Sequence, residues 1–157
     1  WEFKNRVVLV RDMPAVGRGF IERLEPPDIK NFYWTKPSPK NSRKVAVIST
    51  AAVSKRGDRP FSWLARDHRV IGKNDRDLVM THVAVEYDRT AWQLDLNTIL
   101  PLDRLNEMAK DNEIGSVAEK HYTFMGAADP SDMEKSALEV SSEMKKEAVD
   151  TVFLVPV

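Results

Sequence analysis

Two small hydroxyl residues stand at the end of a segment that has the pattern of a buried strand. Ser49 is the last residue of the run 45–49, and Thr50 follows it directly. Small hydroxyl residues at the end of a strand allow backbone amides and a hydroxyl group to come close to a ligand. The same residue types are common in ordinary loops, so the pattern indicates a binding role and leaves the structural alternative open.

A second polar group consists of Asp88, Asp95 and Asn97. If the segment 92–100 is extended, the side chains of Asp95 and Asn97 lie on one face, because residues two positions apart share a face of an extended chain. A cluster of carboxylates can hold a cationic amine or perform acid–base chemistry. Capping and turn roles are commoner for Asp and Asn, and they are the alternative.

The three histidines are the side chains best suited to proton transfer near neutral pH. His68, His82 and His121 are too scattered to match a local metal-binding spacing, so we expect no metal site. His68 has the pattern of a surface loop residue. His82 falls within 79–86, an alternating segment that predicts a strand with one wet face, and it is either a half-buried strand residue or a proton donor facing a cleft.

His121 and Tyr122 open a predicted loop, residues 121–126, which precedes a predicted amphipathic helix. Asp129 is suited to cap that helix and Pro130 to begin it. The positive end of the helix dipole would stabilise an anionic substrate near His121 and Tyr122, which are candidate proton donors. Aromatic packing of the loop is the alternative interpretation.

The composition argues against several classes of protein. The 157 residues include no cysteine, which removes disulfides, thiolate metal sites and thiol nucleophiles from the sequence as given. Lys plus Arg and Asp plus Glu both number 24, so no net charge attracts nucleic acid or anionic lipid. The apolar runs are only as long as strands, which argues against a membrane span. No signal peptide is visible, and the sequence predicts a cytoplasmic protein.

Gly17 and Gly19 follow a short apolar run, residues 7–10, as in the loop of a dinucleotide-binding motif. The third glycine of that motif is absent, and no acidic residue follows at a convincing distance. A turn into a short helix over 19–25 is the simpler interpretation, with Pro26 ending the helix. We therefore expect no nucleotide site.

The elements that would position the candidate residues alternate between strands and helices, which predicts an α/β fold. We predict a three-layer α/β sandwich with a mostly parallel sheet. The predicted strands are 7–10, 45–49 and 151–155, and the predicted helices are 101–110 and 130–148; weaker patterns predict an edge strand at 69–71 and a helical turn at 116–120. The last strand is a run of apolar and β-branched residues that predicts burial on both faces. Ligands of such folds bind at the carboxyl ends of the strands.

Two parts of different character are expected along the chain. Residues 1–44 combine the first strand with a connector rich in proline and basic residues, and residues 45–157 form the α/β core. A chain of this length has room for one domain, or for one domain that carries a long insertion.

Several short motifs occur in an order that resembles one known family. They are Val47-Ile-Ser-Thr-Ala51, Gly57-Asp58, Pro60-Phe61, Tyr87-Asp88, Asp95-Leu-Asn97, Leu100-Pro-Leu-Asp-Arg-Leu105, Ile114-Gly-Ser116 and His121-Tyr-Thr-Phe-Met-Gly126. In order and spacing, from about residue 45 to the end, they resemble the selenoprotein B family of glycine, sarcosine, betaine and D-proline reductases. The Pro-Leu-Asp-Arg-Leu and Tyr-Thr-Phe-Met-Gly pieces are the most specific.

The resemblance implies reductive cleavage of a carbon–nitrogen bond in a small amine or amino-acid substrate. In family members the nucleophile is a selenocysteine or cysteine that follows a strand like 151–155, so it is expected just after Val157, and no cofactor is expected within this chain. A selenol or thiol there, leading into a helix amino terminus, would be held as the anion. The sequence as given ends at Val157 without a cysteine, and it is expected to be inactive alone.

The resemblance also implies roles and partners. The expected substrate-binding residues are Ser49, Thr50, Asp88, Asp95, Asn97 and Gly126. The expected catalytic residues are His82, His121 and Tyr122. The expected partners are other reductase subunits or a thiol electron donor, in an oligomer, with no nucleic acid or membrane. The rival hypothesis is a non-catalytic binding or assembly subunit that retains the same fold.

Overall fold

The computed structural model describes residues 11, 13–23, 34–83 and 89–157. The chain forms two units, residues 1–34 and 35–157. In the first unit the described helix is α1 (Ala15–Ile21), which begins before the helix predicted at 19–25. The strand predicted at 7–10 lies outside the described residues.

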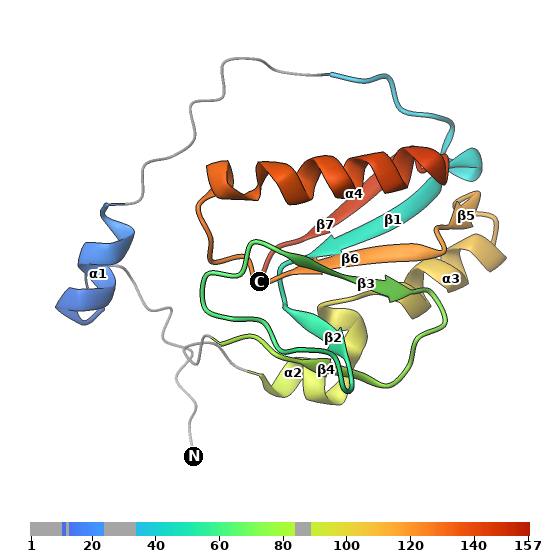
Figure 1. The fold of residues 1–157 in the computed structure, drawn as a ribbon. Coiled ribbons are helices and arrows are strands. Elements are labelled where there is room, and N and C mark those ends of the chain that lie inside the picture. The colour runs from blue at the N-terminus through green and yellow to red at the C-terminus, as the bar shows by residue number, and fades with distance from the viewer. Residues whose placement is uncertain (1–10, 12, 24–33, 84–88) are drawn as a thin grey trace. The chain divides into compact units, whose positions relative to one another are not determined.

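The second unit is built on a curled, mostly parallel sheet (Figure 1). Its strands are β1 (Lys44–Ser49), β3 (His68–Gly72), β5 (Ser116–Val117), β6 (Lys120–Phe124) and β7 (Thr151–Val155). β1 is central, because it pairs in parallel with β7 along one side and with β5 and β6 along the other. β3 pairs antiparallel with β6, which confirms the edge strand predicted at 69–71.

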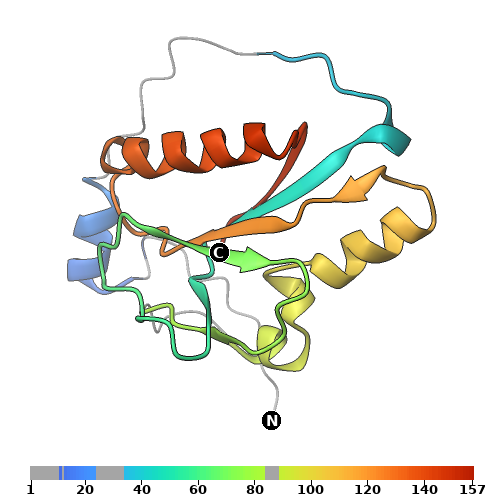
Figure 2. The same ribbon diagram turned by 45° about the vertical axis from the view of Figure 1, so that its right-hand side comes forward.

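Helices lie on both faces of the sheet, and this confirms the predicted three-layer α/β fold (Figure 2). α3 (Leu102–Lys110) packs on one face, where Leu102 and Leu105 meet the alternate β1 residues Val45 and Val47. α4 (Glu134–Lys146) packs on the other face, where its Val140 and Met144 join Ala46 and Phe124. The period-two alternation of β1 therefore supplies both cores. Among the described residues, no helix is long and apolar enough to cross a bilayer.

The start of α4 follows the predicted capping pattern. A 3-10 turn, η4 (Pro130–Met133), leads directly into the helix, with proline at its first position. The Asp129 carboxylate accepts a hydrogen bond of 2.8 Å from the amide of Ser131. This bond satisfies one of the amides that a helix start leaves unpaired, so the end of β6 passes into α4 through a defined turn.

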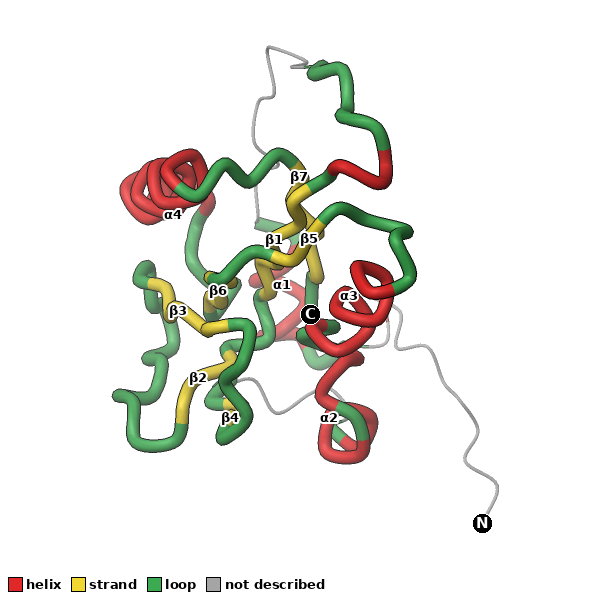
Figure 3. The backbone as a smooth tube through the Cα atoms, turned by 90° about the vertical axis from the view of Figure 1, so that its right-hand side faces the viewer, coloured by secondary structure: helices red, strands yellow, loops and turns green. Residues whose placement is uncertain are grey.

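Smaller elements surround this layered body (Figure 3). β2 (Val53–Lys55) and β4 (Leu78–Met80) form a separate antiparallel pair. The remaining short helices are η2 (Lys40–Ser42), α2 (Thr90–Leu94) and η3 (Leu96–Thr98). The strand expected over 79–86 thus ends at Met80, before His82, and the segment 92–100 expected to be extended or looped contains helical turns. These elements are too short to be identified from the spacing of apolar residues in the sequence.

The largest error of the sequence prediction concerns the segment 116–124. The sequence patterns predict a helical turn and then a loop beginning at His121, whereas this segment forms β5 and β6. His121 and Thr123 are polar, which hides the apolar run that marks a buried strand. The surrounding Tyr, Thr and Phe have high β propensity, and this was the signal available in the sequence.

β7 lies where it was predicted, but its environment differs. Val152, Phe153 and Leu154 are 41%, 49% and 66% exposed. The prediction of burial on both faces is therefore wrong for the described structure. The reason is topological, because β7 pairs with β1 on one side and no described strand pairs with its other side.

Gly115 allows the chain to pass very close to the segment that precedes β1. A Cβ atom on Gly115 would lie 2.6 Å from the backbone carbonyl carbon of Ser42 and 2.8 Å from its oxygen. The next amide, of Ser116, donates to the carbonyl of Arg43 and so begins the pairing of β5 with β1. The close approach therefore precedes the first hydrogen bond of this strand pair.

We predict that Gly115→Ala destabilises the protein by about 1–3 kcal/mol, because backbone atoms must shift to admit the methyl group. The measurement is urea denaturation. Gly19→Ala is the matched control, because a Cβ atom on Gly19 meets nothing within 4 Å and alanine favours the helix α1. Equal stability of Gly115→Ala and the wild type would contradict the close approach.

Candidate active site at the carboxyl ends of the parallel strands

Thr50 ties the end of β7 to the end of β1. Its amide donates to the carbonyl of Val155 at 3.1 Å. Its Oγ1 accepts a hydrogen bond of 2.9 Å from the Val157 amide and donates to the Val157 carbonyl at 3.4 Å. The hydroxyl of Thr50 thus continues the pairing of the two strands beyond the last regular pair, and it holds Val157 in place.

Gly126 lies against the same threonine from the end of β6. Its φ of +78° belongs to the left-handed region, which favours glycine. A Cβ atom on Gly126 would lie 2.7 Å from Cβ of Thr50. The ends of β1, β6 and β7 therefore meet at Thr50, Gly126 and Val157. We call these three residues the strand-end junction.

His121 fills a gap in the hydrogen bonding of β1. The pairs Val45–Val117 and Ile48–Tyr122 enclose two residues of β1 but four residues of the partner chain, so the partner bulges. The bulge carries the partner backbone away from the Val47 amide, which donates instead to Nδ1 of His121 at 3.0 Å. A side chain thus replaces a backbone acceptor in the middle of the sheet.

The same hydrogen bond defines the protonation state of His121. Nδ1 accepts a hydrogen bond from the Val47 amide, so the neutral ring carries its own proton on Nε2. Burial is the main cause that lowers the pKa of His121 to about 4, and the negative charge of Glu147 opposes it. The side chain is 0% exposed, and Nε2 has no hydrogen-bond partner within the described chain. The ring is neutral at physiological pH.

Tyr122 is also buried, on the face of the sheet that α4 covers. Its ring packs edge-on against His68, with ring centroids 5.8 Å apart. Burial raises the pKa of the phenol, and the hydroxyl has no hydrogen-bond partner within the described residues. The structure therefore separates Tyr122 from the strand-end junction by placing it in the core with Phe124 and Val140.

Ser49 lies at the end of β1 but points into the interior. It is fully buried, and its Oγ accepts a hydrogen bond of 3.2 Å from the amide of Ala51. This contact belongs to the turn that follows the strand. Ser49 directly precedes Thr50 of the strand-end junction, but its hydroxyl group already accepts a hydrogen bond from the backbone amide of Ala51.

Asp95 and Asn97 form a capping motif. The Asp95 carboxylate accepts from both the amide and the side-chain Nδ2 of Asn97, at 2.9 and 2.8 Å, and these bonds lower its pKa. Asn97 Oδ1 accepts from the amide of Asp103 at 3.0 Å, and its Nδ2 also donates to the Asp103 carboxylate. These contacts join η3 to the start of α3. Asp88, the third member of the predicted group, lies outside the described residues.

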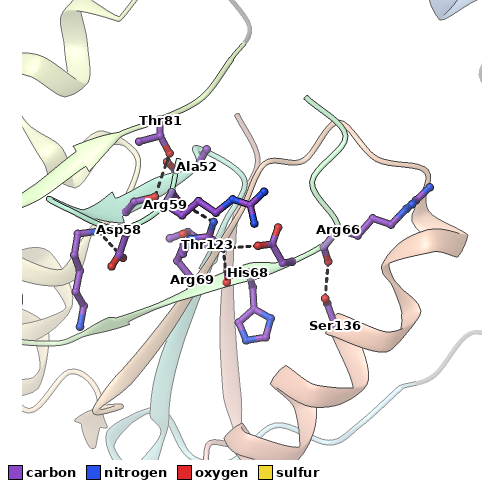
Figure 4. A network of polar contacts seen from close by, with 12 residues as sticks. Ala52, Asp58, Arg59, Arg66, His68, Arg69, Thr81, Thr123 and Ser136 are labelled. Atoms are coloured by element: carbon purple, nitrogen blue, oxygen red, sulfur yellow. Dashed lines mark hydrogen bonds and ion pairs between the residues drawn. The ribbon is translucent and has the colours of Figure 1, made fainter. Parts of the chain in front are cut away.

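His82 lies in the chain that returns to the carboxyl edge of the sheet. Its neighbour Thr81 donates from both its amide and its Oγ1 to the carbonyl of Ala52 (Figure 4). On the other side of His82, Val83 packs near Ala52 and Met125. Ala52 and Met125 are close in sequence to Thr50 and Gly126, so the backbone of His82 is held at the same edge as the strand-end junction. The His82 side chain is half-buried.

Sequence reasoning missed the turn formed by Ala52. This buried alanine has a φ of +50°, in a region that residues with a side chain rarely adopt. Its amide donates to the carbonyl of Phe124, and its carbonyl accepts from Thr81. Backbone strain of this kind gathers at functional sites and persists only where surrounding bonds enforce it. Two consecutive alanines after a strand were the available signal, since small residues tolerate crowded turns.

Two hollows flank the end of β7. One, of about 640 Å³, lies between the sheet and α4 and has Thr50 and Gly126 in its lining. The other, of about 350 Å³, is lined by Asn97 and by residues 153–156. Since α3 and α4 cover opposite faces, the predicted substrate-binding residues divide between two faces of the sheet. Among the residues that the structure describes, no three His, Asp or Glu side chains are placed to hold a metal ion.

A family model described as glycine/sarcosine/betaine reductase selenoprotein B (GRDB) matches residues 72–157, more than half of the chain. The chain belongs to this family. This match confirms the family that the sequence motifs resemble. The matched region contains Gly126 and Val157 of the strand-end junction, whereas Thr50 lies before it.

D-proline reductase subunit gamma of Acetoanaerobium sticklandii is 28% identical to this chain over 138 residues. The alignment covers 83% of this chain and 54% of the relative, so the chain spans about half the length of that curated protein. No solved structure matches the chain.

We predict that the stability of the protein falls as the pH drops from about 6.5 to about 4. In that range the unfolded chain protonates His121, whereas the folded chain keeps it neutral with a pKa of about 4. The difference contributes up to about 3 kcal/mol in favour of the folded state above pH 6.5, and this contribution is lost as the pH falls toward 4.

Urea denaturation at a series of pH values measures this dependence. His121→Asn keeps an acceptor for the Val47 amide and removes the titration, so its stability should vary less with pH than that of the wild type. Above about pH 7.5 the two proteins should show the same slope, because His121 is neutral there in both the folded and the unfolded chain. Equal slopes for the wild type and His121→Asn between about pH 4 and about pH 6.5 would refute the assignment.

We predict that Thr50→Val frees the end of β7, because valine keeps the shape of threonine and loses both bonds to Val157. The expected loss is about 1 kcal/mol, or roughly 2–4 °C in Tm. Hydrogen exchange of the Val157 amide, followed by NMR, should become faster. Thr50→Ser keeps the hydroxyl group and should protect this amide as the wild type does. Unchanged exchange in Thr50→Val would show that Thr50 does not hold Val157.

Proposed function

We propose that this chain is part of a subunit of a glycine-, betaine- or proline-type reductase that cleaves the C–N bond of a small amino acid or amine. Membership of the selenoprotein B family supports the proposal, as does the similarity to D-proline reductase subunit gamma. The nucleophile in this proposal is a selenocysteine or cysteine that follows Val157 in the full-length protein. The remaining subunits of the reductase are the proposed partners.

The observation that carries the proposal is the strand-end junction. Three adjacent parallel strands end together there, and such edges are where α/β proteins bind ligands and perform chemistry. Thr50 fixes both backbone groups of Val157 by hydrogen bonds. A nucleophile in the next position would therefore leave the sheet from a held residue, close to the hollow lined by Asn97 and residues 153–156.

The proposed reaction consumes two electrons and two protons for each C–N bond that breaks, because carbon and nitrogen each gain one hydrogen. A selenol or thiol supplies the nucleophilic, redox-active atom. A dithiol that is oxidised to a disulfide supplies both electrons and both protons. The chain's own residues hold the reacting segment and shape the hollows around it.

Among the three proposed proton donors, His82 fits the geometry best. It is half-buried and lies at the carboxyl edge, held there by Thr81 and Val83. His121 and Tyr122 are fully buried, and Nδ1 of His121 is used by the Val47 amide. We therefore propose His82 as the catalytic acid, with His121 as a residue that positions β6.

The predicted substrate-binding residues also receive more specific proposals. Thr50 uses its hydroxyl on Val157, so we propose that it positions the nucleophile and that Gly126 maintains this contact. Asp95 and Asn97 use their polar atoms within the turn before α3, so we propose that they shape the hollow on that face. Asp88 keeps its proposed role beside the substrate amine.

The test uses the full-length protein, including the residue after Val157, assembled with its partner subunits and supplied with a dithiol. Glycine, sarcosine, betaine and D-proline are offered in turn. One of them should be reduced with one dithiol consumed for each bond cleaved. His82→Gln should lower kcat by about 10²- to 10⁴-fold, as expected for loss of a general acid. His68→Gln is the control, and it should retain the wild-type rate.

One outcome would contradict the proposed role of His82, and another would contradict the proposed reductase function. Wild-type activity in His82→Gln would remove His82 from the mechanism and leave the reductase assignment in place. An assembled complex that reduces none of the four substrates would favour the rival function, a non-catalytic binding or assembly subunit with the same fold.

A further inference from the structure

The free edge of β7 has the composition of an internal strand. Its residues Thr-Val-Phe-Leu-Val include no charge and no proline, and no described strand pairs with the side that faces away from β1. Natural sheets protect exposed edges with charged residues, proline, bulges or a covering element. The opposite edge, β3, contains Arg69, which bonds to the carboxylate of Asp67. Within residues 34–83 and 89–157 of the structure, no strand or charged β7 residue gives the β7 edge such protection.

An apolar groove continues from β7 toward α4, and we call it the α4 groove. Its volume is about 640 Å³, and its apolar lining includes Ile48, Phe124, Ala137, Val140, Met144 and Val152. Val152 belongs both to the groove and to the free strand, so the two surfaces are continuous. A contiguous apolar surface of this kind marks a place where another element packs.

The polar groups around the α4 groove argue against a small-molecule ligand. Small-molecule sites combine apolar walls with a few polar groups that orient the ligand. Here the Thr50 hydroxyl is bonded to Val157. The Asp150 carboxylate accepts from the amide of Lys44 and the hydroxyl of Thr151, both at 3.0 Å. Ser141 and Lys145 lie in the lining along α4, where an exposed lysine suits the border of a protein contact.

The connectivity of the sheet indicates which element fits. The chain passes from β6 through α4 to β7, crossing over β1 to reach a parallel strand. Such crossovers are right-handed in nearly all proteins. A next crossover, from β7 to a strand on its free side, would move in the same direction across the sheet. Its helix would therefore lie on the same face as α4, over the α4 groove.

We propose that the α4 groove and the free edge of β7 together receive a helix and a following parallel strand, formed by residues that come after Val157 in a longer form of this chain. The alignment covers 54% of the curated relative, so that protein has residues outside the matched region, and our proposal places residues of this kind after Val157. The inference shares with the proposed function the condition that residues follow Val157. It does not require catalysis.

The test compares the 157-residue chain with the longer form encoded by its gene, with cysteine in place of any selenocysteine. Ala137→Asp places a charge in the α4 groove. In the longer form it should lower Tm by more than about 4 °C and expose the residues after Val157 to limited proteolysis, whereas in the 157-residue chain it should change Tm by less than about 2 °C. Leu138→Asp is the matched control, because Leu138 is 65% exposed and outside the groove lining, and it should have little effect in either form.

Three outcomes would overturn the inference. One is an equal change of Tm for Ala137→Asp in the two forms. The second is a concentration-dependent dimer of the 157-residue chain that Ala137→Asp abolishes while leaving the longer form unaffected, which would assign the groove to a second copy. The third is a gene without coding sequence past codon 157. A longer form that responds as expected but lacks reductase activity would support this inference and reject the proposed function.

Discussion

The hydrogen bond from the Val47 amide to His121 sets the alignment on which the rest of the sheet depends. β1 is bonded on both sides, and the partner chain must insert two extra residues between its pairing with Val45 and its pairing with Ile48. The imidazole satisfies the backbone group that this bulge would otherwise leave unpaired in the core. Without that acceptor, the Val47 amide would be buried without a hydrogen bond, and the register of β6 against β1 that leads to Gly126 would be destabilised.

The strand-end junction follows from this register. Because Tyr122 lies opposite Ile48 and Thr123 opposite Ser49, the chain leaving β6 reaches Gly126 beside Thr50. β7 pairs with β1 along its whole length, so its end arrives at the same threonine. The ends of β6 and β7 thus converge because both strands pair with β1. The hydroxyl group of Thr50, which follows β1, bonds to Val157 just after β7.

The sequence predicts the elements whose patterns are long and local, and it fails where the structure depends on distant partners. The runs at 45–49 and 151–155 and the stripe of α4 are recognisable because apolar periodicity is strong there. His121 interrupts the apolar pattern of β6. This histidine is buried in the core, where its Nδ1 accepts the hydrogen bond of the distant Val47 amide. The polar atoms of Asp95 and Asn97 bond within the turn before α3, which is the capping alternative that the sequence left open beside a substrate role. The exposure of β7 depends on its neighbours, which its own residues do not encode.

The central position of β1 also has a consequence for synthesis. Val45 pairs with Thr151, so roughly a hundred residues separate β1 from its most extensive partner. At ribosomal rates of about 5–20 residues per second, β1 leaves the ribosome about 5–20 s before β7. During that interval a strand with three fully apolar core positions has no partner on that side. The nascent chain therefore passes through a period in which the β7 side of β1 is unpaired and open to other chains.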